Sequence, residues 1–220
     1  MFSYDSKFNQ AVNKIIDCIF LSLLWLISSL PVVTIGASTT ALYHTVNSVF
    51  RKAEGSIWKE YWRVFRRDFK RATGLWAIMV VIIAILAVNA YAAFFTGVVN
   101  ESLQILLQIG AVFLTALMAV WLQCWFPYLS RFDDPVKIIM KNTLAIMMAE
   151  TKVAIRLLML FVLVVALDIV LSIYAPVLTI VMPVAYISAL NRILEQLFAR
   201  YIAQQETSGQ AGGEEIARNK

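Results

Sequence analysis

The side chains that could do chemistry in this sequence are few and lie far apart. Asp168 is the lone acid in the apolar run 154–174, and His44 is the single histidine. An acid inside a membrane segment marks a pathway, a proton relay or a pairing partner, and a histidine can switch its charge near neutral pH. For both residues the alternative is structural, namely a hydrogen bond to a neighbouring helix.

No motif of an enzyme accompanies these two residues. The sequence lacks a nucleophile elbow, a P-loop, an HExxH motif and a dinucleotide fingerprint. A single histidine excludes a multi-histidine metal site, and Cys18 and Cys124 lack the CxxC spacing of a zinc site. We therefore expect a protein that is not an enzyme and that has no metal and no cofactor.

The composition predicts that these residues lie on membrane helices. Of the 220 residues, 60% are hydrophobic and 15% are charged, and the mean hydropathy is +0.74. A soluble domain carries about 25% charged residues, and its core could not hide this much apolar surface. The apolar runs lie at about 15–33, 74–96, 103–129, 154–174 and 175–190. Since about 20 residues of helix cross a bilayer, we expect an all-α, polytopic membrane helix bundle.

The lysines and arginines predict how the chain crosses the membrane. They gather before the first apolar run, in 51–72, between 131 and 156, and after the last run, whereas 97–102 has none. Cation-rich connections stay in the cytoplasm. Both chain ends then face inward, and residues 34–50 must bring the chain back across. We expect about six membrane segments, with the second one short and polar, either crossing or re-entrant.

This second segment carries the first set of candidate site residues. It follows the stretch LPVVTIGAST, in which Pro31 ends the first helix and Gly36 permits a bend. The hydroxyl groups can satisfy backbone groups that lipid cannot, or they can contact a ligand. The candidate ligand or turn residues are Thr34, Gly36, Ser38, Thr39, His44 and Asp168.

Residues 51–72 are predicted to form a basic amphipathic helix at the cytoplasmic surface. Ser56 can cap it, and aromatic residues then recur at helical spacing between cations. Such a helix can lie on anionic lipid, dock a partner, or simply pack on its neighbours in solvent. The candidate partner- or lipid-docking residues are Trp58, Lys59, Trp62, Arg63, Arg66, Arg67, Phe69 and Lys70. Because topology accounts for the cations, we expect no nucleic-acid partner.

The remaining expectations concern the ends of the last segments. Arg192 and Glu195 stand three residues apart and are expected to pair as an interfacial anchor. Trp121, Trp125 and Tyr128 are expected to form an aromatic belt. We expect one helix-bundle domain over 1–205, followed by a disordered cytoplasmic tail over 206–220, which is poor in apolar residues.

Three stretches resemble the YesL-like family of bacterial integral membrane proteins, a domain of unknown function. They are LPVVTIGASTTALYHTV, IWKEYWRVFRRDFKRATGLW and FPYLSRFDDPVKIIMKNTLAIMM, and the resemblance covers about 1–205. Asp68 departs from it, since the family usually has asparagine there. The resemblance implies a multi-pass protein of the bacterial cytoplasmic membrane, whose genes often accompany those of carbohydrate ABC importers and polysaccharide breakdown. It implies no catalytic residues.

Two functions follow as expectations. The first is a non-enzymatic accessory subunit of an oligosaccharide ABC importer, with the lipid bilayer, the importer's membrane subunits or further copies of this chain as partners. The alternative is a small stand-alone transporter or channel, with a polar pathway through the second segment and Asp168.

Overall fold

The computed structural model describes residues 7–51, 56–95 and 100–218, and these fold into helices without a strand. The all-α fold class is therefore confirmed for the described residues. The α-helices are α1 (Lys7–Ser29), α2 (Ile35–Thr45), α3 (Ile57–Phe95), α4 (Glu101–Gln123), α5 (Trp125–Arg131), α6 (Val136–Ala149), α7 (Thr151–Tyr174), α8 (Pro176–Thr179) and α9 (Met182–Arg218). A 3-10 turn at Val32–Thr34 precedes α2, and a π-helical turn at Val46–Arg51 follows it.

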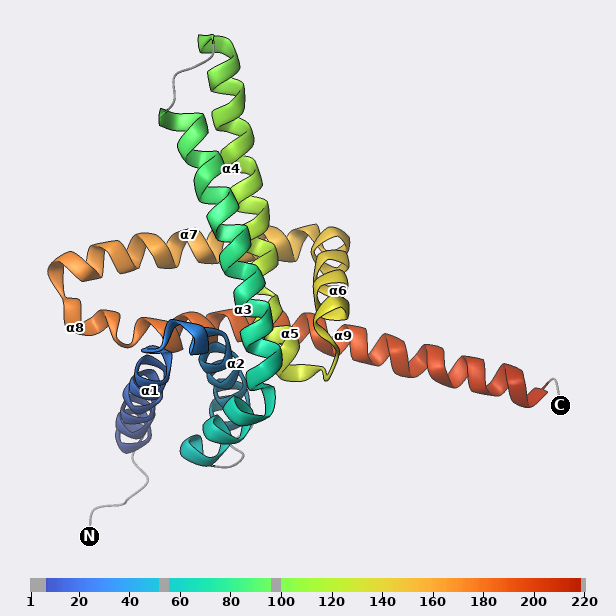
Figure 1. The fold of residues 1–220 in the computed structure, drawn as a ribbon. Helices are drawn as coiled ribbons and strands as arrows, with labels where there is room; N and C mark the ends of the chain where they lie inside the picture. The colour runs from blue at the N-terminus through green and yellow to red at the C-terminus, as the bar shows by residue number, and fades with distance from the viewer. Residues whose placement is uncertain (1–6, 52–55, 96–99, 219–220) are drawn as a thin grey trace.

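Two helix pairs dominate the architecture. Helices α3 and α4 form a long hairpin, and α7 and α9, joined through α8, run across it (Figure 1). Helices α1 and α2 lie near the base of this hairpin, where α2 packs along the first half of α3 (Figure 1). The buried core lies where α2, α3, α5 and α9 meet, around Tyr43, Tyr61, Trp125 and Leu194.

Four helical segments are long and apolar enough to cross a membrane. They are Val12–Ser29, Ile57–Phe95, Glu101–Arg131 and Thr151–Tyr174. Only 6% of the apolar window of α7 is buried inside the protein, so its side chains face outward, as those of a lipid-exposed helix do. The chain thus has the character of a membrane protein, while the count of six segments and the inward orientation of both ends stay predictions.

The other two predicted segments do not form long helices. Helix α2 has 11 residues, or about 16 Å, against about 30 Å of hydrocarbon core. This agrees with a short second segment. The apolar run 175–190 is divided between α8 and α9, which meet at a turn just before Met182.

The basic segment differs from the expected separate surface helix. It continues without a break into the next apolar run, so that α3 has 39 residues and a length of about 57 Å. No proline interrupts this stretch, and Gly74 lies inside the helix. Arginine and lysine before that glycine, and alanine and leucine after it, all favour helix.

Gly36 serves a close helix crossing. It lies in the first turn of α2, while the reversal of the chain is made by Pro31 and the 3-10 turn before it. A Cβ atom at Gly36 would lie 2.5 Å from the carbonyl oxygen of Ala72 and 2.8 Å from Cβ of Trp76. Glycine is therefore needed here because the backbones of α2 and α3 nearly touch, and the predicted bend lies earlier in the chain.

The last helix extends into the C-terminal segment. Helix α9 continues through Arg218 and extends away from the other helices (Figure 1), and the disorder that composition predicts over 206–220 stays a prediction. Once a helix is nucleated by a packed segment, glutamate, glutamine and alanine extend it readily. These residues are frequent in the stretch 203–218.

Candidate functional site

The hydroxyl groups of the second segment bond to their own helix. Thr34 Oγ1 donates to the carbonyl oxygens of Ser28, at 2.5 Å, and Pro31, at 2.6 Å, and thereby closes the turn before α2. Four further hydroxyls donate to the carbonyl four residues earlier; they belong to Ser38 (2.9 Å), Thr39 (2.7 Å), Thr40 (2.9 Å) and Thr45 (2.8 Å). The polarity of this segment is thus largely used within α2 and its turn.

His44 lies between α3 and α5 and does not line the cavity that contains Asp168. Its Nδ1 is 3.4 Å from the carbonyl oxygen of Ser130, and its Nε2 is 3.6 Å from Oε2 of Glu60. Burial lowers the pKa of His44, and the nearby Arg67 acts in the same direction. The imidazole is therefore held neutral near pH 7 and links two helices.

Asp168 lines a cavity of about 550 Å³ between α1, α2, α7 and α9. Thr39 lines the same cavity, so the structure brings together two of the predicted site residues. Thr34, Ser38 and His44 are not among its lining residues. The other walls are mainly apolar, with the rings of Trp25 and Tyr186 among them. We call this space the acidic cavity.

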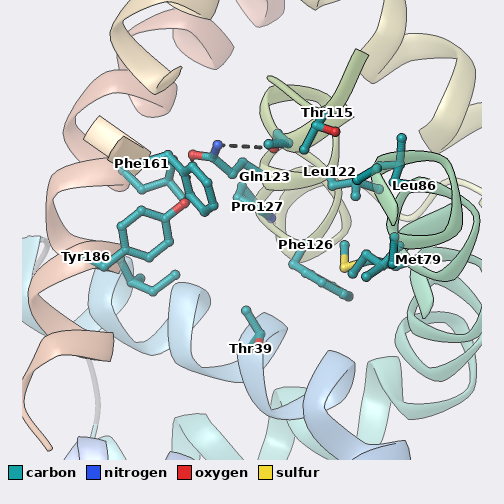
Figure 2. A pocket seen from close by; sticks show the side chains of 16 residues that line it. Thr39, Met79, Leu86, Thr115, Leu122, Gln123, Phe126, Pro127, Phe161 and Tyr186 are labelled. Carbon is teal, nitrogen blue, oxygen red and sulfur yellow. Dashed lines mark hydrogen bonds between the residues drawn. The ribbon is translucent and has the colours of Figure 1, made fainter. Parts of the chain in front are cut away.

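A second cavity, of about 480 Å³, lies between α2, α3, α4, α7 and α9. Figure 2 shows Tyr186, Phe161 and Gln123 on one side of it and Met79 on the other. The Tyr186 hydroxyl donates to Oε1 of Gln123 at 2.7 Å, and Gln123 Nε2 donates to the carbonyl oxygen of Ala119 at 3.1 Å. Since most of its lining residues are apolar, we call this space the apolar cavity.

The predicted docking residues divide into two groups. Five of them line a groove of about 540 Å³ on the outer side of α3, namely Trp58, Lys59, Trp62, Arg63 and Arg66. We call it the docking groove. The others lie outside it: Arg67 pairs with Asp68, Phe69 packs against the core, and Lys70 is exposed.

The charges in the docking groove are only partly matched. Arg63 donates to Oε2 of Glu60 at 2.5 Å, whereas Lys59 and Arg66 have no ion pair with any described residue. The indole N–H of Trp62 is enclosed and has no acceptor among the described residues. The groove therefore presents, beside tryptophan rings, two cations that no described acid neutralises.

An ionic cluster that the sequence analysis did not single out lies on the opposite side of α3. Asp68 is fully buried and accepts hydrogen bonds from Arg67, at 3.1 and 2.7 Å, and from Arg71, at 2.5 Å. Arg71 also donates to Oδ1 of Asp133 at 2.8 Å, which lowers the pKa of Asp133. The spacing of Asp68 and Arg71 was the available signal, since residues three apart share a helix face.

The prediction that Arg192 and Glu195 pair with each other is wrong. Glu195 is buried and pairs with Arg131 of α5, while Arg192 is exposed. Trp125 and Tyr128 are buried in the protein core instead of forming a lipid-facing belt. Both errors have one cause, because α5 follows α4 after a turn at Cys124 and packs inward.

The fold and these sites define a helical membrane protein with a basic docking groove and two cavities between its helices. Residues 18–90 match the family model described as "Protein of unknown function, DUF624". The match covers about half of α1, all of α2 and most of α3, and it is consistent with the YesL-like resemblance. No curated protein and no solved structure matches the chain.

Proposed function

We propose that this protein is a non-enzymatic, multi-pass protein of the bacterial cytoplasmic membrane that serves as an accessory subunit of an oligosaccharide ABC importer. The observation that carries the proposal is the docking groove, with Lys59 and Arg66 unmatched by any described acid. The resemblance to the YesL-like family supplies the kind of partner. If both chain ends lie in the cytoplasm, as the charge distribution predicts, the groove would face the cytoplasmic side of the importer's membrane subunits.

The chemistry of the groove suits a protein partner with an acidic and apolar surface. Tryptophan and arginine are the side chains that contribute most at protein interfaces. Trp58 is 52% exposed, and its ring lies 5.8 Å from that of Trp62. Glu60 fixes Arg63 beside them, so part of the surface is ordered before a partner binds, which lowers the entropic cost of binding.

Co-purification tests this proposal. The tagged chain, expressed at its native level and extracted in mild detergent, should bring down the membrane subunits of a carbohydrate importer. The variant Lys59→Glu/Arg63→Glu/Arg66→Glu should lose them because it reverses the charge of the groove. The matched control, Lys137→Glu/Lys141→Glu, changes exposed lysines on α6 and should retain them. Recovery of the intact chain without any importer subunit would contradict the proposal.

The alternative is a stand-alone transporter or channel. It is favoured by the acidic cavity, where Thr39 and Asp168 meet. It is disfavoured by the hydroxyls of α2, because most of them donate to carbonyl oxygens of their own helix and are not free to line a polar pathway. Purified protein in liposomes should then carry sugars or ions, and Asp168→Asn should alter the flux. Absence of flux over a broad panel of sugars and ions would exclude this function.

A further inference from the structure

One polar side chain that lines the acidic cavity has no hydrogen bond or ion pair with a described residue. The indole N–H of Trp25 donates to Thr39 Oγ1 at 3.3 Å, and the Thr39 hydroxyl itself donates to the carbonyl oxygen of Ile35. The Tyr186 hydroxyl donates to Gln123, and Thr179 has a partner as well. Asp168, in contrast, has no hydrogen bond or ion pair with any residue that the structure describes.

No counter-charge from a described residue lies in this cavity. Its described lining includes no lysine, arginine or histidine. A carboxylate among apolar walls is costly unless it is neutralised or paired. Asp168 is exposed on this side of α7, so a group from outside the chain can reach it, and the complement of a carboxylate is a positive charge.

The surroundings of Asp168 distinguish between kinds of cation. A hard metal ion needs about six or more oxygen ligands, and the cavity offers one carboxylate with its hydroxyls already committed. The described residues hold no group of three or more histidine, cysteine, aspartate or glutamate side chains that could bind a metal. The rings of Trp25 and Tyr186, on the other hand, suit an organic cation, which aromatic faces attract.

The apolar cavity extends this site. It shares the lining residues Thr39, Tyr186 and Ile187 with the acidic cavity, so the two adjoin at these side chains. Its Gln123 and Tyr186 side chains are hydrogen-bonded, and its walls are formed by side chains such as Met79, Leu86 and Phe161 (Figure 2). Cavities of about 300–1,000 Å³ are typical of small-molecule sites.

We propose that the two cavities form one binding site for a lipophilic organic cation, an amine or a quaternary onium ion. Its charge lies at Asp168, and its apolar body lies against Tyr186, Ile187 and the walls of the apolar cavity. The site does not depend on an importer partner, so its test stands apart from the co-purification experiment.

Equilibrium binding of tetraphenylphosphonium to the purified full chain in nanodiscs of zwitterionic lipid tests the site. We expect saturable binding at one site per chain. Asp168→Asn preserves the shape of the side chain but removes its charge, and it should weaken binding roughly tenfold or more. Val165→Trp should also abolish binding, because Val165 lines the acidic cavity and the larger ring fills it.

The controls separate charge recognition from general partitioning. Asp17→Asn, on α1 and outside both cavities, should bind the probe as the unchanged chain does. Tetraphenylborate has the same shape and the opposite charge, and it should not compete. Binding that is non-saturable, that is equal in the folded Asp168→Asn variant, or that tetraphenylborate displaces would overturn the proposal. Thermal unfolding of each variant establishes that it is folded.

Discussion

Arg131 Nε lies 2.9 Å from Oε1 of Glu195, and a second hydrogen bond joins Arg131 Nη2 to Oε2 of the same carboxylate. The bidentate pair connects α5 to α9 across 64 residues of sequence. Only 6% of Glu195 is exposed, and Tyr43 of α2 also donates to it, at 3.4 Å. One carboxylate thus holds three helices at a single point.

Removing one member of this pair should destabilise the fold. Arg131→Met leaves Glu195 buried without its cation, and breaking a buried ion pair in this way costs about 3 kcal/mol. We expect a lower thermal unfolding midpoint in detergent. Arg192→Ala, on the exposed side of the same α9 helix, is the control and should change the midpoint little. Equal midpoints for Arg131→Met and the unchanged chain would show that the pair is not structural.

The surroundings of Gly36 and Gly110 predict opposite effects when each glycine is replaced by alanine. Gly36→Ala places a Cβ atom 2.5 Å from the Ala72 carbonyl oxygen, so the helices must separate at a cost of about 2 kcal/mol. Gly110→Ala, in α4, meets nothing within 4 Å and should stabilise the helix by about 1 kcal/mol. Both are measured by thermal unfolding. A neutral Gly36→Ala would mean that the two helices cross at a greater distance.

The buried carboxylate of Asp68 predicts a salt-dependent defect. Asp68→Asn keeps a side chain of similar shape but removes the negative charge between Arg67 and Arg71. The arginines then repel each other across the amide, and we expect a loss of about 2 kcal/mol in unfolding free energy. Added salt should reduce this loss by screening the repulsion. An unchanged unfolding midpoint at low salt would show that an amide serves equally well at this position.

His44 predicts a pH dependence of stability. Burial lowers its pKa in the folded state below the usual 6.5, so the unfolded chain takes up the proton at a higher pH. The stability from neutral His44 is then complete above about pH 6.5 and is lost as the pH falls toward the folded-state value. Unfolding midpoints between pH 7.5 and 5.5 should fall less in His44→Gln than in the unchanged chain. A parallel fall in both proteins would assign the effect to other groups.

The sequence predicted the helices that depend on local pattern. Long apolar stretches of about 20 residues predicted α1, the apolar parts of α3 and α4, and α7. A helix of this length and composition is favourable in lipid whatever its neighbours are. The shortness of α2 also followed from its residue count. These properties depend on composition along one segment, and no knowledge of neighbours is needed to read them.

The contacts that decide the candidate sites depend on neighbours distant in sequence, and the pattern predicted them poorly. Glu195 could pair equally well with Arg192, three residues away, or with Arg131, and only the inward turn of α5 decides between them. Thr39 and Asp168 were each identified as candidates. Their meeting in one cavity requires α7 to return beside α2, a relation that no local periodicity contains.

Helix α3 has a mechanical consequence as one continuous element. Its contact with Gly36 at Ala72 lies about 22 Å from the end that bears the docking groove and about 35 Å from the end at Phe95. A continuous helix transmits a tilt of one end to the other end. A tilt of about 10° in its apolar arm moves the groove by about 4 Å. A change in bilayer thickness that tilted the hairpin as a rigid body would therefore displace the docking groove as well.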